Sequence, residues 1–238
     1  NRCFSVDSPN QSIITAIFLP NSVEELGRYC FNMADITEFR VPDNLKICNS
    51  PFLNNPRLTK FTGNNTDGHS VIIDNILWCY APGIKNDSYV IPDGVIEIGT
   101  GAFDATKIKN ITIPESVKRI NYLAFERSSL LSVTIPQSVE YIADNAFDLC
   151  FDLQGYYGNS RFVSDDNMCF ITDDFRVSGG KQLNAFAGHN LSSYKIPEGI
   201  TSIRTMSFHY GGENLISVTL PNSIMNVDAL AFKDLPKL

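Results

Sequence analysis

Short stretches of alternating apolar and polar residues recur along this chain. In the segment 130–136, Val133 and Ile135 alternate with small polar residues such as Thr134. This alternation predicts a β-strand with one buried face, because successive side chains of a strand point to opposite sides. Pro136 follows and ends the strand, since proline cannot donate a hydrogen bond to a neighbouring strand.

The residues after the proline predict that the chain crosses to the opposite side of a coil. Val139 and Ile142 are three residues apart, so we expect both side chains to turn inward. Ala146 and Phe147 then close the unit, and the ring is expected to fill the space between neighbouring layers. A short helical or 3₁₀ turn is the local structure predicted there.

This unit of strand, proline, crossing and phenylalanine repeats with a period of about 22 residues, twice in succession over 108–129 and 130–150. The repeat prolines are Pro20, Pro42, Pro92, Pro114, Pro136, Pro197 and Pro221. The matching phenylalanines are Phe31, Phe52, Phe103, Phe125, Phe147, Phe208 and Phe232. Two more coils begin at Leu58 and Leu153 and then depart from the pattern, which makes about nine coils. A fixed period of this size predicts a solenoid, in which each coil buries its apolar face by stacking on its neighbours.

The two departing coils contain insertions, near residues 64–86 and 159–190. Each insertion is predicted to form short strands or a β-hairpin in place of the usual turn. In the longer second insertion, the Ser-Gly-Gly-Lys sequence at 178–181 is the predicted turn.

The insertions also match each other in sequence. Both contain an Asp-Asn pair followed by apolar residues, at 74–75 and at 166–167. Both return to a regular strand at a tyrosine, Tyr89 in the first and Tyr194 in the second. A larger unit of regular coils followed by an inserted one is therefore predicted to occur about twice.

The repeat has the pattern L-x-x-I/V-x-I-P-x-S/G-V/I-x-x-I-x-x-x-A-F, which stands here as LLSVTIPQSVEYIADNAF and LISVTLPNSIMNVDALAF. This pattern resembles the leucine-rich repeats of BspA-like bacterial surface proteins, a class first described in spirochaetes. The resemblance runs from Ile14 to Leu238. It implies an α/β-type leucine-rich-repeat solenoid that is strand-dominated, with a curved parallel sheet on one face and helical or 3₁₀ turns opposite. We expect residues 1–238 to form a single solenoid domain.

Composition and charge narrow the classes of partner. The net charge is −7 and the isoelectric point is near 4.9. Nucleic acid is therefore not expected as a partner, because phosphate binding needs clustered Lys and Arg. No apolar run approaches the roughly 20 residues that span a bilayer, so direct membrane insertion is not expected.

The cysteines and the chain ends give weaker signals. The six cysteines are Cys3, Cys30, Cys48, Cys79, Cys150 and Cys169, with no metal-binding spacing. We expect most of them to be buried apolar groups, with a disulfide as the alternative. The first residues resemble neither a signal peptide nor an anchor. Leu238 stands where a tenth coil would begin, so we expect the solenoid to be truncated at its C-terminus.

No catalytic motif is present, and neither an enzyme activity nor a cofactor is predicted: HExxH, GxSxG, P-loop and GxGxxG sequences are all missing. The best metal candidate is the acidic group Asp165, Asp166, Asp173 and Asp174. Calcium would suit these carboxylates, but their spacing matches no EF-hand and Asp pairs are common at turns. We therefore predict no metal site.

The candidate binding surface is the outward-facing row of the strands, which a curved solenoid gathers into a concave sheet. One residue per coil gives Phe18, Arg40, Thr62, Val90, Thr112, Thr134, Tyr157, Lys195 and Thr219. Phe18, Arg40, Tyr157 and Lys195 stand out from the Thr ladder as candidate partner-binding residues, since aromatic residues and Arg are enriched at binding hot spots. The alternative is that they are ordinary surface residues.

Two functions from different classes fit this sequence. The first is an extracellular or cell-surface recognition and adhesion module, which binds a host or matrix protein or another surface component through the concave sheet or the insertions. BspA-like relatives are associated with attachment to host proteins, so the resemblance implies this function. The second is a structural spacer that presents another domain and binds nothing itself. The sequence leaves the ligand and the oligomeric state open.

Overall fold

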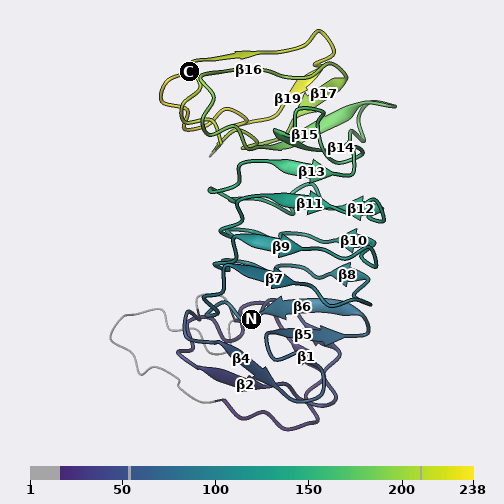
Figure 1. The fold of residues 1–238 in the computed structure, drawn as a ribbon, viewed down its shortest axis with the longest axis vertical. Coiled ribbons are helices and arrows are strands. Elements are labelled where there is room, and N and C mark those ends of the chain that lie inside the picture. Colours follow the sequence, from purple (N-terminus) through teal and green to yellow (C-terminus); the bar gives the residue numbers. More distant parts are fainter. Residues whose placement is uncertain (1–16, 53–54, 210) are drawn as a thin grey trace. The chain divides into compact units, whose positions relative to one another are not determined.

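The structure, a computed structural model, describes residues 17–52, 55–209 and 211–238. The chain divides into two compact units. Unit 1 comprises Asn1–Ser129 with Ser138–Asp148, and unit 2 comprises Leu130–Gln137 with Leu149–Leu238. Across the described ranges every regular element is a β-strand (Figure 1). A single domain over the whole chain stays a prediction.

Unit 1 contains two rows of short parallel strands and one hairpin (Figure 1). The pre-proline strands, which occupy the stretch predicted before the repeat proline, are β2 (Glu38–Arg40), β4 (Lys60–Thr62), β7 (Ser88–Val90) and β9 (Asn110–Thr112). The post-proline strands are β1 (Glu25–Leu26), β3 (Ile47–Cys48), β8 (Glu97–Ile98), β10 (Arg119–Ile120) and β12 (Tyr141–Ile142). The hairpin consists of β5 (Ser70–Ile73) and β6 (Ile76–Tyr80), and it joins a sheet in the order β12-β10-β8-β6-β5.

Neighbouring coils of unit 1 align at the repeat spacing that the sequence predicts. Val90 lies opposite Thr112 in the pre-proline row, and Ile120 lies opposite Ile142 in the post-proline row. The inward turn predicted for Val139 and Ile142 is confirmed, since both side chains are buried. The sequence did not indicate that this crossing forms a second row of strands, because two-residue strands carry no periodicity.

A ladder of phenylalanine rings occupies the space between the coils, as predicted. Phe103, Phe125 and Phe147 are buried, and their ring centroids follow one another at 5.2 Å with nearly parallel planes. This spacing lies within the range of favourable aromatic pairs. The ladder therefore adds ring stacking to the burial that each coil obtains from its neighbours.

The helical or 3₁₀ turns predicted around each phenylalanine are not confirmed. From residue 101 to 106, alternate N–H groups donate to carbonyls of the next coil, and those between them donate to carbonyls three residues earlier. Gly101 and Ala105 are also left-handed, with φ of +61° and +56°. A helix needs consecutive right-handed residues with internal hydrogen bonds. Hydrogen bonding between coils thus replaces helix formation, and the described solenoid is all-β.

The first insertion forms the predicted hairpin. Asp74 and Asn75 connect β5 to β6 with φ of +52° and +62°. Positive φ at both loop residues is the requirement of a type I′ turn, which Asn and Asp tolerate better than most residues. Behind the hairpin, the Tyr89 hydroxyl donates a 2.5 Å hydrogen bond to Asp67 Oδ2 and lies 3.0 Å from Ser70 Oγ.

Unit 2 repeats the same plan. Its pre-proline strands are β11 (Val133–Ile135), β13 (Tyr156–Gly158), β16 (Ser193–Lys195) and β18 (Ser217–Thr219), paired as β11–β13 and β16–β18. Its second sheet has the order β14-β15-β17-β19, formed by β14 (Cys169–Asp173), β15 (Lys181–Phe186), β17 (Ile200–Ile203) and β19 (Asn226–Val227). β14 and β15 are the predicted second hairpin, and the predicted turn lies between them.

The second insertion is fastened in the same way as the first. The Tyr194 hydroxyl donates to Asp166 Oδ2 at 2.8 Å and lies 3.1 Å from Cys169 Sγ. Asp166 is therefore the structural counterpart of Asp67. The sequence match between the Asp-Asn pairs at 74–75 and 166–167 was wrong, because the first pair is a hairpin tip and the second precedes its hairpin.

Four of the five described cysteines are buried, as expected: Cys30, Cys48, Cys79 and Cys169. Cys48 Sγ and Cys79 Sγ are 3.5 Å apart, and burial raises the pKa of the Cys48 thiol well above its usual value. No disulfide joins the described cysteines, and Cys3 lies outside the described residues. The described residues also include no helix long and apolar enough to cross a membrane.

Candidate functional site

The predicted outward row is exposed in both units. Phe18 is 92% exposed and Tyr157 is 41% exposed, and Arg40 and Lys195 are also exposed. Phe18 and Arg40 lie in unit 1, whereas Tyr157 and Lys195 lie in unit 2. Each unit therefore carries two of the four candidate residues, and no single unit contains the complete set.

The four side chains differ in how available they are. The Arg40 guanidinium donates to Asn21 Oδ1 at 2.7 Å and to Asp43 at 3.2 Å, so its charge is already partnered. The Tyr157 ring lies over Gly155, where an added Cβ would come within 2.9 Å of the hydroxyl oxygen. Lys195 has no acidic partner in the described part of the chain. Of the two cations, Lys195 is the one available to a ligand.

Unit 1 also has a groove beside the first insertion, with a volume of about 530 Å³. We call it the lysine groove. It is lined by Met33, Asn55, Pro56, Pro82, Gly83, Lys85, Ala105 and Lys107. A second hollow of about 550 Å³ shares Pro56, Gly83 and Lys85 with it and adds Arg57, Thr59 and His69, among others. The two hollows therefore adjoin each other at these three shared residues.

Gly83 allows the end of the first insertion to pack closely on the preceding coil beside the lysine groove. Its N–H donates to the Leu58 carbonyl at 2.8 Å. A Cβ at this position would lie 2.6 Å from the Leu58 carbonyl oxygen and 2.7 Å from that of Pro56. Only glycine allows this approach without a backbone shift. The return of the first insertion to the solenoid therefore packs tightly against the preceding coil and fixes Pro82 and Lys85 beside the groove.

The two lysines of the groove are distinctive in their electrostatics. Elsewhere in the described part of unit 1, lysines pair with acids one coil away, as in Lys60–Glu38 at 3.3 Å and Lys109–Asp87 at 3.1 Å. Lys85 and Lys107 have no acidic side chain within ion-pair distance there. The sequence pattern did not single out these two lysines, because they lie outside the outward-facing row of the strands. The available signal was their separation by one repeat period, which places them at the same position of successive coils.

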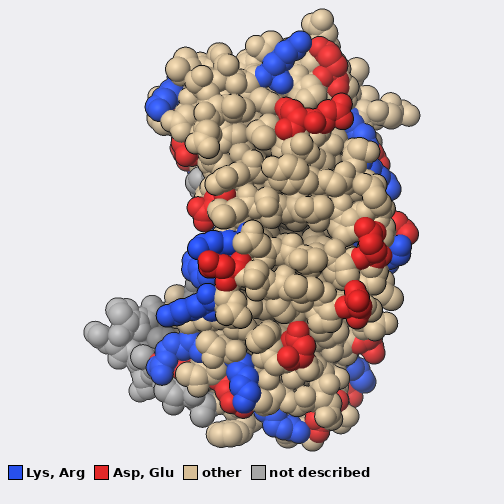
Figure 2. Space-filling view, in the orientation of Figure 1, with Lys and Arg blue, Asp and Glu red and all other residues tan. Residues whose placement is uncertain are grey.

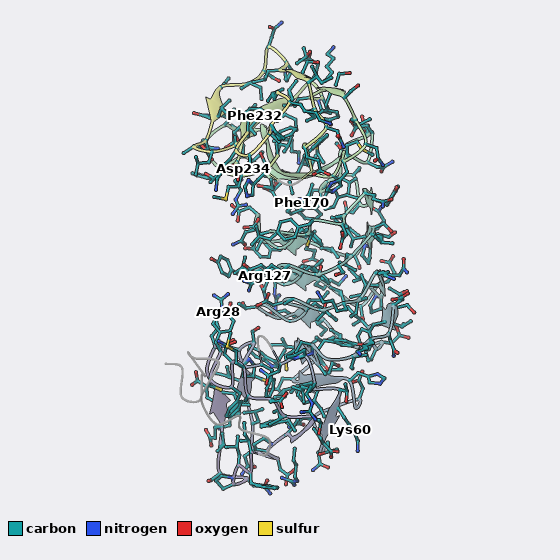
Figure 3. All side chains as sticks on the ribbon, turned by 90° about the vertical axis from the view of Figure 1, so that its left-hand side faces the viewer. Arg28, Lys60, Arg127, Phe170, Phe232 and Asp234 are labelled. Atoms are coloured by element: carbon teal, nitrogen blue, oxygen red, sulfur yellow. The ribbon has the colours of Figure 1, made fainter. Side chains whose placement is uncertain are left out.

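The most buried charges of unit 1 form a structural network instead. Arg127 donates to both Asp104 carboxylate oxygens, at 3.0 and 3.1 Å, and Arg28 lies 3.9 Å from Glu126. Figure 3 shows Arg28 and Arg127 close together on one side of the unit. Burial raises the pKa of Asp104 and of Glu126, although the neighbouring arginines oppose this shift. The network holds these four charges against one another in ion pairs.

The acidic candidates of the second insertion are used separately. Asp166 accepts a hydrogen bond from Tyr194. Asp173 accepts hydrogen bonds from Lys181 at 2.6 Å and from Arg161 at 3.0 Å. The buried Asp174 accepts one from Thr201 at 2.8 Å. Within the described residues, no three acidic, histidine or cysteine side chains converge as metal ligands would. Asp166, Asp173 and Asp174 thus each have their own hydrogen-bond donors in and around the hairpin.

The fold and the repeat lead to a family. A sequence model of the BspA type leucine-rich repeat region matches residues 3–76, 78–173 and 182–238, with six copies of the repeat. The chain belongs to the BspA-type leucine-rich repeat family. The resemblance inferred from the repeat is thereby confirmed. No curated protein matches this chain in sequence.

Solved structures share the fold of this family member. A leucine-rich cell surface protein from Faecalibacterium prausnitzii aligns with a TM-score of 0.56 and 20% identity, over 87% of this chain and 65% of that protein. The pneumococcal vaccine antigen PcpA aligns with a TM-score of 0.53 and 21% identity, over 91% of this chain and 55% of PcpA. The chain therefore spans less than two thirds of each protein. Identities this low establish a common fold and nothing finer.

Proposed function

We propose that this chain is an extracellular protein-recognition and adhesion module of a bacterial surface or secreted protein, and that it binds its partner at the lysine groove. One observation carries the proposal: beside the first insertion, an open groove combines apolar side chains with two cations. Recognition sites usually have this form, a concave and mostly apolar surface with a few polar groups that fix orientation.

The family supports an extracellular location. BspA-type repeats make up most of the chain, and the similar protein from F. prausnitzii is described as a cell surface protein. Leucine-rich solenoids commonly serve recognition, because stacked coils present extended surfaces on which single residues vary without disturbing the core. Attachment to a host or matrix protein is the specific form of recognition that we propose.

The pre-proline strand row is the second candidate surface. Phe18 is exposed but precedes the first described strand. Within the row, Lys195 is available, whereas Arg40 is held by Asp43 and Asn21. The residues between them are mainly Thr, Ser and Asn, which suit a β-sheet surface but give a partner few strong contacts. This row therefore ranks behind the groove.

The spacer function is favoured by the remainder of the surface. Cations and acids pair between neighbouring coils, as in Lys46–Glu24 at 2.8 Å and Arg119–Glu97 at 2.6 Å. On the face drawn in Figure 2, acidic and basic side chains lie interspersed, with wide uncharged areas between them. A surface neutralised in this way offers little to a charged partner, as a pure spacer would require.

A binding screen on the intact protein separates these functions. The wild type, a groove variant (Met33→Ser with Pro82→Ser) and a row variant (Arg40→Ala, Tyr157→Ser and Lys195→Ala) are applied to immobilised host matrix proteins and glycans. We expect a protein partner whose binding falls about tenfold or more in the groove variant, as loss of a recognition contact implies, and persists in the row variant. Loss only in the row variant would transfer the function to the strands, and the absence of any partner would support the spacer.

A further inference from the structure

We infer that the lysine groove receives an acidic segment of a protein, with carboxylate side chains at Lys85 and Lys107 and apolar side chains on the groove floor. This inference rests on the function proposed above and specifies the chemistry of the partner. It is carried by the pairing of charges in unit 1, the position of the two lysines in the repeat, and the composition of the groove.

Charge pairing distinguishes these two lysines from the other cations of the unit. In the described part of unit 1, every other lysine and arginine lies within 4.0 Å of a carboxylate. These pairs are Lys46–Glu24, Lys60–Glu38, Lys109–Asp87, Lys118–Glu140, Arg28–Glu126, Arg40–Asp43, Arg57–Asp35, Arg119–Glu97 and Arg127–Asp104. Lys85 and Lys107 have no such partner. The two cations that lack a carboxylate partner among the described residues of unit 1 thus line the same groove.

The repeat places these two charges one above the other. β7 and β9 pair in register one repeat period apart, and Lys85 and Lys107 precede these strands by the same number of positions. Stacked coils are separated by about 4.8 Å, so the two side chains start from neighbouring points. A protein segment with one carboxylate between the two lysines, or with two successive carboxylates, would match this pair of charges.

The lining of the groove favours a protein segment over a sulfated glycan. Met33, Pro56, Pro82 and Ala105 provide apolar contact area beside the lysines. Apolar side chains of a peptide can fill this area, whereas a polyanionic glycan offers mainly sulfate groups and needs a wider array of cations. The adjoining hollow lined by Thr59 and His69 adds polar contacts next to the lysine groove.

The test uses a labelled peptide of repeated Glu-Pro-Leu triplets, its Gln-Pro-Leu counterpart and heparin, each titrated against the full chain by fluorescence anisotropy. We expect the Glu peptide to bind about tenfold or more tightly than the Gln peptide, because only the first carries carboxylates. Binding should weaken as salt rises, since the lysines are exposed and their charges are screened.

Matched variants assign the effect to the groove. Lys85→Gln with Lys107→Gln should lower the affinity for the Glu peptide about tenfold. Lys46→Gln with Lys109→Gln changes the net charge equally, removes only paired lysines and should leave the affinity unchanged. Equal binding of both peptides, equal loss in the two double variants, or tighter heparin binding through Lys85 and Lys107 would each overturn the inference.

The same variants separate this inference from the proposed function. If the partner found in the screen is lost with Met33→Ser and Pro82→Ser but retained with Lys85→Gln and Lys107→Gln, the groove is the binding site and its partner is not acidic. If all of these variants retain the partner, the proposed site itself is wrong.

Discussion

Tyr89 and Tyr194 occupy a position at which other coils carry an apolar residue, such as Ile111 or Val133. Both tyrosines are more than nine-tenths buried, and the hydroxyl group of each donates a hydrogen bond to an aspartate of the preceding insertion. A buried hydroxyl is costly unless it is hydrogen-bonded. The tyrosine and the aspartate therefore depend on each other, and together they fasten each insertion to the regular coil that follows it.

Removing either hydroxyl should destabilise the protein. Tyr89→Phe and Tyr194→Phe are each expected to lower the free energy of unfolding by about 1–2 kcal/mol, because the hydrogen bond from a buried hydroxyl to a carboxylate is lost. Urea unfolding followed by circular dichroism measures the change. Tyr141→Phe is the control, since that side chain is 51% exposed and should behave like the wild type. A neutral result for both buried tyrosines would contradict the fastening role.

The Asp67 hydrogen bonds should make stability depend on acid. Burial alone would raise the pKa of Asp67, but donors from Tyr89, Ser70 and His69 outweigh it and hold the pKa below the ordinary 3.8. A lowered folded-state pKa contributes stability above pH 3.8, and this contribution is lost as the pH falls through the folded value.

Asp67→Asn should therefore remove part of the acid sensitivity. Urea midpoints measured at about pH 5 and about pH 2.5 should converge more in this variant than in the wild type. Burial raises the pKa of Asp104 and of Glu126. Protonation of these two groups therefore does not destabilise the folded state at low pH, and it cannot account for the acid sensitivity assigned to Asp67. An unchanged difference between the two midpoints would exclude the contribution of Asp67.

At the scale of elements, the two inserted coils end their pre-proline strands with glycine where regular coils have an apolar residue and proline. Gly63 and Gly158 have φ of +112° and +98°. A Cβ on Gly63 would lie 2.8 Å from the Val41 carbonyl oxygen, and one on Gly158 would collide with that of Ile135. These glycines turn the chain out of the solenoid, tight against the preceding coil.

Gly158→Ala should consequently be much more damaging than a glycine substitution in open space. Alanine would adopt a disfavoured backbone conformation there, and its Cβ would collide with the Ile135 carbonyl. We therefore expect the free energy of unfolding to fall by about 3 kcal/mol or more. Gly94→Ala is the matched control, because Gly94 has a similar φ of +91° and no atom within 4 Å of the added Cβ. Thermal unfolding compares the two variants, and similar losses would show that the collision is relieved by a small shift.

At the scale of the whole molecule, each coil is stabilised by the coils next to it. In unit 1 the ring of Phe125 stacks on both Phe103 and Phe147 at 5.2 Å. Stability in such arrays is close to a sum over coils and their nearest-neighbour contacts. A destabilising substitution in one coil should therefore reduce the stability of the coils in contact with it more than that of distant coils.

Phe125→Leu tests this locality. The smaller side chain leaves a cavity and should destabilise the protein by about 1–3 kcal/mol. In hydrogen exchange with mass spectrometry, we expect protection to fall in β8, β10 and β12 of unit 1 and to change less in β16 and β18 of unit 2. A uniform loss across all strands would show that the chain unfolds as one cooperative body.

Much of this molecule could be read from its sequence because a solenoid has translational symmetry. Once the repeat period is known, the neighbours of Val90 and Ile120 follow from arithmetic, and so does the burial of Phe103, Phe125 and Phe147. The hairpins were also predictable. The helical turns were not excluded by the sequence, because an Ala-Phe turn fits a helix until bonds to the next coil are taken into account.

The sequence by itself determined the repeating coil, its register and its inward face, since these depend only on the spacing between similar residues. Tertiary structure alone decided what the insertions do. It matched Asp67 to Tyr89, partnered Arg40 with Asp43, and left Lys85 and Lys107 without acidic partners among the described residues. The physical reason is that an insertion breaks the period, so contacts near it depend on the path of the chain and on which charges that path brings within a few ångströms.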